Sequence, residues 1–81
     1  MFLEILTPEK KVFAGETKLF KVPGSNGSFE VMDKHAPIIS TLDEGQLKII
    51  TKDDQTKVFF VKGGVLEVKN NHAILLVEEL T

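Results

Sequence analysis

Residues that favour turns divide this sequence into short runs, which are expected to form strands spaced about 6–12 residues apart. The clearest turn clusters are Pro23-Gly24, Asp43-Glu44-Gly45, Asp53-Asp54, Gly63-Gly64 and Asn70-Asn71. The runs between these clusters are rich in β-branched and aromatic residues, and none shows a helical period with caps. The pattern predicts an all-β fold, a small β-sandwich or flattened barrel of about 8–10 short, mostly antiparallel strands.

The turn clusters also set the boundaries of the expected strands. These strands lie at residues 2–7, 18–22, 28–32, 38–42, 46–51, 56–62, 65–69 and 73–77. A short apolar piece at 12–14 is expected to end at Gly15. Asn70-Asn71 predicts a two-residue hairpin turn, because asparagine tolerates positive φ. Every residue of 73–77 is apolar, which predicts that both faces of this last strand are covered.

Length and composition predict an ordinary globular protein. We expect residues 1–81 to form a single domain. The sequence has no cysteine, so packing alone has to stabilise it. A net charge of −2 and a hydrophobic share of 42% predict neither a nucleic-acid partner nor disorder. The longest apolar run is far shorter than the roughly 20 residues that cross a bilayer, and no basic leader begins the sequence. We therefore expect a soluble intracellular protein with no direct membrane insertion.

The sequence contains no catalytic pattern, so we predict neither an enzyme nor a metal or cofactor site. His35 and His72 are the available histidine bases, and neither accompanies a nucleophile pattern such as Gly-x-Ser-x-Gly. They also form no closely spaced pair of metal ligands in the sequence. The segment GSNGS at 24–28 lacks the lysine and the helix of a phosphate loop, and we expect a turn between strands there.

The tripeptide His35-Ala36-Pro37 predicts a stiff corner, because a residue before proline is restricted to extended geometry. The histidine has two possible roles at this corner. Its ring donates a hydrogen bond to a nearby carbonyl and locks the corner, or it contacts a partner; the sequence favours the first role and leaves the second open. His72 is expected to be an exposed residue beside a turn, without a special role.

The block GSNGSFEVMDKHAPIISTLDEG at 24–45 resembles the signature region of the ATP synthase epsilon subunit, which is called delta in mitochondria. The family pattern is G-x-x-G, an apolar strand, H-A-P-[LI]-[LI]-[ST] and a glycine that closes the next turn. The residues at those places are Gly24, Gly27, His35, Ala36, Pro37, Ile38, Ile39, Ser40 and Gly45. Similar matches are LEILTPE at 3–9, FAG at 13–15 and KGGVLEV at 62–68. The resemblance thus covers nearly the whole chain in the right order.

The resemblance implies a β-sandwich at the foot of the rotating central stalk of the F-type ATP synthase. Such a subunit performs no chemistry. It contacts the gamma subunit and the polar loops of the membrane ring of c subunits, so that proton flow stays coupled to ATP synthesis or hydrolysis. The implied location is the cytoplasmic side of the bacterial inner membrane, where the chain would be a peripheral part of the F1 sector in a hetero-oligomeric complex.

By position, the resemblance assigns two sets of contact residues. Those expected to face the c-ring loops are Ser25, Asn26, Gly27 and Ser28. Those expected to face the gamma subunit are Thr7, His35, Ala36, Pro37 and Ser40.

Three features depart from the family pattern. Lys34 stands where a glycine commonly precedes His-Ala-Pro, and it adds a charge near the expected contacts. Ser28 stands where many members have an acid, so the ring contact is expected to be hydrogen-bonded or made by Glu30. Members usually continue into a helical hairpin that inhibits ATP hydrolysis, whereas this sequence ends at Thr81. Neither the inhibitory function nor a nucleotide site is therefore expected in these residues.

Two other hypotheses remain open. The first is a generic β-sandwich module that binds a ligand or partner, although the sequence has no tryptophan or tyrosine to supply an aromatic platform. The second is an enzyme, whose turnover would be lost on His35→Ala.

Overall fold

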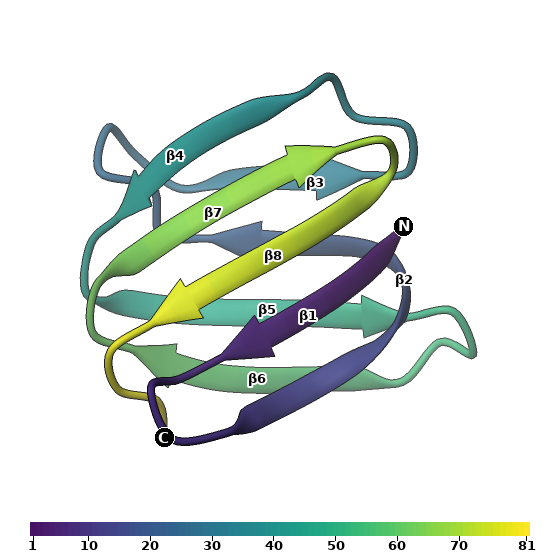
Figure 1. The fold of residues 1–81 in the computed structure, drawn as a ribbon. Helices are drawn as coiled ribbons and strands as arrows, with labels where there is room; N and C mark the ends of the chain where they lie inside the picture. The colour runs from purple at the N-terminus through teal and green to yellow at the C-terminus, as the bar shows by residue number, and fades with distance from the viewer.

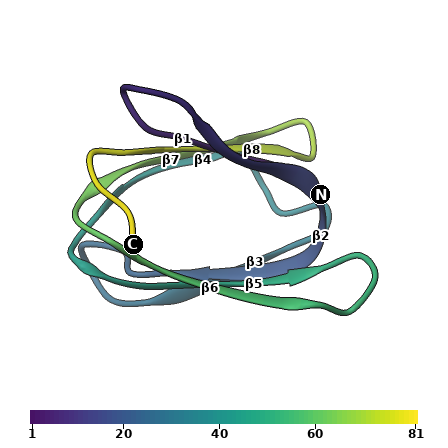
Figure 2. The same ribbon diagram turned by 90° about the horizontal axis from the view of Figure 1, so that it is seen from below.

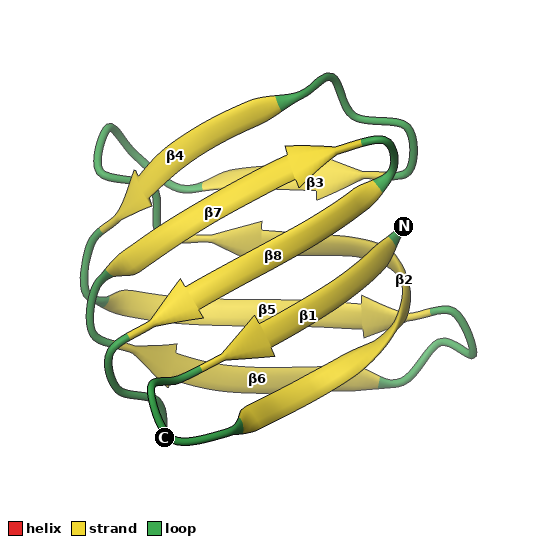
Figure 3. Cartoon of the chain, in the orientation of Figure 1, coloured by secondary structure: helices red, strands yellow, loops and turns green.

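Eight β-strands and no helix make up the computed structural model of this chain, which describes residues 1–81 (Figures 1 and 3). The strands are β1 (Phe2–Leu6), β2 (Lys11–Val22), β3 (Phe29–Met32), β4 (Ile38–Leu42), β5 (Gly45–Thr51), β6 (Thr56–Val61), β7 (Gly64–Lys69) and β8 (His72–Val77). The predicted all-β fold is confirmed. Every strand pairing is antiparallel except that of β1 with β8.

The strands form one strongly curled sheet that folds over itself into two layers (Figure 2). We call the layer with the order β4-β7-β8-β1-β2 sheet A, and the layer with the order β3-β2-β5-β6 sheet B. Strand β2 belongs to both layers. The two layers enclose the core between their inner faces, as in a β-sandwich.

Strand β2 passes from one layer to the other near its middle. Its first half pairs with β1 as far as Glu16, and its second half pairs with β3 and β5 from Thr17 onward. The register with β5 shifts between Thr17 and Leu19, which leaves Lys18 as an extra residue. A bulge of this kind bends a strand and increases its twist. The bulge therefore lets one strand serve both sheets.

The expectation that the strand ends at Gly15 is wrong. Gly15 pairs with Leu3 inside β2, and the ring of Phe13 covers the place of its missing side chain. A Cβ atom added at Gly15 would lie 3.3 Å from Phe13 Cζ. Glycine inside a strand commonly marks such a close approach rather than a turn. The two short pieces expected from the sequence are thus one strand of 12 residues.

The core is a single cluster of 15 buried hydrophobic residues between the two sheets. Both layers contribute to it, and Phe20 is its largest fully buried side chain. The cluster consists of Met1, Leu3, Ile5, Phe20, Val22, Val31, Leu42, Leu47, Ile49, Val61, Leu66, Val68, Ala73, Leu75 and Val77. No buried side-chain nitrogen or oxygen atom lacks a hydrogen-bond partner.

The expectation that both faces of the last strand are covered is also wrong. Burial alternates along β8: Leu75 is fully buried, whereas Leu76 is 51% exposed. The alternation arises because β8 lies between β7 and β1 in the middle of sheet A, whose outer face has no second layer over it (Figure 2). An apolar run in such a strand leaves hydrophobic side chains at the surface.

Leu75 and Leu76 provide a matched test of this one-sided burial. We expect Leu75→Ala to lower the free energy of unfolding by about 2–5 kcal/mol, because it empties part of the core. We expect Leu76→Ala to lower it by less than about 1 kcal/mol. Urea denaturation of both variants measures the difference, and equal losses would contradict the burial pattern.

Candidate functional site

The segment at 25–28, here called the glycine turn, is fully exposed and carries no charge. Gly27 has a φ of 119°, which glycine adopts without strain, and its N–H donates to the Gly24 carbonyl over 3.0 Å. Gly24 is buried beneath the turn, where an added Cβ would lie 2.6 Å from the Phe29 ring. The turn therefore presents hydroxyl, amide and backbone groups to a partner. Ser25, Asn26, Gly27 and Ser28, all expected to face the c-ring, lie together here.

Ser40 lies beside the glycine turn rather than with the other residues expected to face gamma. A hollow of about 530 Å³ separates the turn from β4, and Ser40 lines it together with Ser25 and Phe29. Two contacts close the hollow at one end. The Thr41 hydroxyl donates to Ser25 Oγ over 2.8 Å, and the Ser25 N–H donates to the Thr41 carbonyl over 3.0 Å.

The His35 ring contacts a nearby carbonyl, as expected if the histidine locks the corner. His35 Nδ1 lies 2.7 Å from the Ala36 carbonyl oxygen, which accepts a hydrogen bond in the tautomer with Nδ1 protonated. The His35 N–H donates to the Met32 carbonyl over 3.1 Å. Ala36 and Pro37 are exposed and His35 is half-buried, so the corner also offers surface to a partner.

Asn71 holds this corner against the turn between β7 and β8. Its side-chain carbonyl accepts from the Lys34 N–H over 2.7 Å, and its amide donates to Asp33 Oδ1 over 2.9 Å. Asn70 and Asn71 both have positive φ, as the predicted hairpin turn requires. Lys34 has a φ of 65°, a conformation that favours glycine for a steric reason.

Thr7 lies at the opposite corner of sheet A from His35. It begins the turn between β1 and β2, where its hydroxyl and N–H both bond to the Lys10 carbonyl. A hollow of about 320 Å³ adjoins it, lined mainly by Thr7, Pro8, Val65 and Leu76. A third hollow, of about 440 Å³, lies beside Pro37 and Ile39 at the other corner.

The outer face of sheet A connects these two corners and carries exposed apolar side chains beside charged ones. Val65 and Leu6 flank Leu76 on the neighbouring strands. The exposed fractions are 38% for Val65, 51% for Leu76 and 75% for Ile39. Exposed apolar side chains that gather on one face mark an interaction surface more often than scattered ones do.

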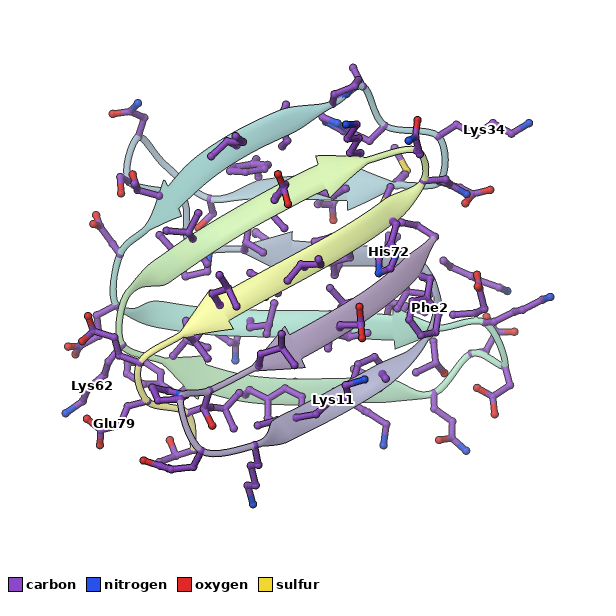
Figure 4. The ribbon with its side chains drawn as sticks, in the orientation of Figure 1. Phe2, Lys11, Lys34, Lys62, His72 and Glu79 are labelled. Atoms are coloured by element: carbon purple, nitrogen blue, oxygen red, sulfur yellow. The ribbon has the colours of Figure 1, made fainter.

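A charged cluster lies on the same outer face. Glu4 accepts from Lys11 Nζ over 3.0 Å through Oε1, and its Oε2 lies 2.8 Å from His72 Nε2. The Lys11 hydrogen bond, followed by that of His72, lowers the pKa of Glu4. The His72 ring also meets Phe2 edge-on, with ring centroids 5.2 Å apart (Figure 4). His72 is exposed and follows the turn, as expected, and it also contacts Glu4 and Phe2.

Neither the glycine turn nor the outer face of sheet A resembles a reaction centre. No group of three or more histidine, cysteine, aspartate or glutamate side chains is placed to hold a metal ion. No helix in the structure is long and apolar enough to span a membrane. The two surfaces offer hydrogen-bonding groups and exposed apolar side chains, which suit binding to another protein.

The whole chain, residues 1–81, matches the model of the family described as "ATP synthase, Delta/Epsilon chain, beta-sandwich domain". The chain belongs to this family. Its membership confirms the resemblance found in the sequence, and with it the prediction of a non-catalytic ATP synthase subunit rather than an enzyme.

Relatives within the family share much of this sequence. The ATP synthase epsilon chain of Chlorobaculum tepidum is 40% identical over 79 residues, which cover 98% of this chain and 90% of the relative. That of Protochlamydia amoebophila is 41% identical over 78 residues, but the matched part covers only 53% of it.

Solved structures share the fold at lower sequence identity. A chain in the mitochondrial ATP synthase central stalk and c-ring of Tetrahymena thermophila aligns with a TM-score of 0.85 at 23% identity. A chain in the Euglena gracilis mitochondrial enzyme aligns with a TM-score of 0.89 at 13% identity. The present chain spans 65% and 51% of these two chains.

The conformation of Lys34 gives a prediction about the corner. Because a Cβ is unfavourable at this φ, we expect Lys34→Gly to raise the free energy of unfolding by about 0.5–1 kcal/mol. Lys34→Ala removes the charge and keeps the Cβ, so it should leave stability nearly unchanged. Urea denaturation distinguishes the two. A gain with alanine equal to that with glycine would assign the effect to charge instead.

The lowered pKa of Glu4 predicts a pH effect with a definite sign. Ionised Glu4 stabilises the fold above the usual titration range of a glutamate, and this contribution is lost as pH falls through its lowered pKa. Stability measured from about pH 7 to about pH 3 should therefore fall less steeply in Glu4→Gln than in the unmodified chain. Glu67→Gln, an exposed control on the same face, should keep the original slope.

Proposed function

We propose that this chain is a non-catalytic rotor subunit that links the gamma subunit to the c-ring of an F-type ATP synthase. In this role it keeps proton flow coupled to ATP synthesis or hydrolysis. Family membership supports the proposal, as does the similarity of the fold to a chain from a central stalk and c-ring structure. The proposal includes a location on the cytoplasmic side of a bacterial inner membrane, as a peripheral part of the F1 sector.

The observation that carries the gamma contact is the group of exposed apolar side chains on the outer face of sheet A, Ile39, Val65 and Leu76. Thr7 and His35, both expected to face gamma, lie at opposite corners of this sheet. One flat partner that touches both corners has to cover the face between them, where Leu76 and Ile39 are exposed. Covering these side chains removes apolar surface from water, which favours association.

The glycine turn suits the c-ring contact. Its exposed groups are uncharged hydrogen-bonding partners, and its backbone is fixed by the bonds of Gly27 and Ser25. A fixed turn loses little conformational entropy when it binds polar loops. Ser28 makes this contact without the ion pair that an acid would provide.

The body between the two surfaces is suited to transmitting force. Fifteen buried residues fill the space between the sheets, and close-packed interiors of this kind have low compressibility. A load applied at the outer face of sheet A therefore reaches the glycine turn with little deformation of the domain.

A charge placed on the outer face tests the gamma contact. We expect Leu76→Glu to weaken binding to purified gamma subunit by at least about tenfold, because the carboxylate would be buried without a partner. Val58→Glu is the matched control, since Val58 is 52% exposed but lies on β6 of sheet B. It should leave the affinity unchanged. Isothermal titration calorimetry measures both.

Equal weakening by the two variants would contradict the assignment of the gamma contact to sheet A. Failure of the unmodified chain to bind gamma at micromolar concentration would overturn the proposed function. A ligand that raises the melting temperature of a chain unable to bind gamma would favour the generic binding module instead.

A further inference from the structure

Strand β4 has an open edge with a free hydrogen-bonding pair. The Thr41 carbonyl points away from β7, because it accepts from the Ser25 N–H. Backbone groups two residues apart in a strand point the same way, so the N–H and C=O of Ile39 also point to this edge. No backbone hydrogen bond outside the strand ladders involves Ile39. Its donor and acceptor are therefore available to an added strand.

Three other stretches of sheet edge are covered or short. The last residues of the chain cover the edge of β6, where Phe60 and Thr81 exchange hydrogen bonds of 2.8 and 2.9 Å. The far end of β4 is covered by the bridge between Gly24 and Leu42. Strand β3 has only four residues, and one of them is the charged Glu30. Besides the first half of β2, which pairs only with β1, the middle of β4 is the edge that remains ready for pairing.

The composition of β4 favours pairing too. Protein edges are usually guarded by charges, prolines or bulges, yet the sequence IISTL of β4 contains no charge and no proline. Ile39 is the most exposed large hydrophobic residue of the chain, at 75%. The hollow of about 530 Å³ beside Ser40 lies along the same edge. A paired strand would occupy this side, at about 4.8 Å from β4.

We propose that an extended segment of the gamma subunit adds to sheet A along the edge of β4. This inference rests on the proposed function and deepens it. The side chain of Ile39 lies on the outer face of sheet A, and its backbone lies at the edge of the same sheet. A partner that covers the outer face can therefore also contact the edge. Ser40 lines the hollow rather than the face, and a strand at the edge explains how gamma meets it.

The lining of the hollow defines the side chains of the added segment. On the side of β4, Ser40 lines it with a hydroxyl group and Ile39 with an apolar side chain, and the Phe29 ring adds further apolar surface. None of the residues that line it is charged. The segment therefore carries small or β-branched uncharged residues, and its main-chain bonds to Ile39 add to the affinity.

Hydrogen–deuterium exchange tests the pairing on the unmodified chain. The amide of Ile39 should exchange freely in the isolated chain and become protected in the complex with purified gamma subunit. Binding of gamma without protection of this amide would overturn the added strand and leave the proposed function standing. Absence of binding would overturn both. Protection in the isolated chain, with dimers in solution, would assign the edge to a second copy and also overturn the proposal.

Two substitutions of Ile39 distinguish the contribution of its backbone N–H from that of its side chain. Ile39→Pro removes the outward N–H without breaking a bond to β7, and proline is tolerated on edge strands whose N–H faces solvent. Ile39→Ala shortens the side chain and keeps the N–H. We expect the proline variant to bind gamma about tenfold more weakly than the alanine variant. Equal affinities, with both variants folded by circular dichroism, would contradict strand addition.

Discussion

The bend in strand β2 is the constraint on which the rest of this structure depends. Sheets A and B share this strand, which changes layer at the bulge around Lys18. Because its two halves remain one covalent strand, the inner faces of the sheets close over a common core that contains Phe20. The same closure turns the outer face of sheet A and the glycine turn outward at fixed positions. The positions of both proposed contact surfaces thus follow from one bent strand.

Much of this fold follows from local sequence signals. Turn clusters at Pro23-Gly24 and Asn70-Asn71 bound real strands, and the absence of a helical period is matched by the absence of helices. The errors arise where tertiary contacts override a local signal. In the sequence, Gly15 predicts the end of a strand, but in the structure it lies inside a continuous strand and is covered by the ring of Phe13. The apolar run of β8 indicates burial on both faces, yet no second layer covers Leu76.

The candidate surfaces were predictable to different degrees. The glycine turn and the His35 corner each lie within a short stretch of sequence, so their residues could be found from the family pattern. The cluster of Glu4, Lys11 and His72 could not, because it depends on the parallel pairing of β1 with β8 at the two ends of the chain. No local signal specifies that pairing. The open edge of β4 likewise depends on which strands lie beside it, although its uncharged sequence is visible beforehand.

A reconstruction of the complete ATP synthase that contains this chain, by cryo-electron microscopy, tests the central claim most directly. The account predicts that gamma covers the outer face of sheet A, including Leu76 and Ile39, and that the glycine turn meets the c-ring loops. A map in which that face is exposed to solvent, while gamma contacts sheet B, would contradict it.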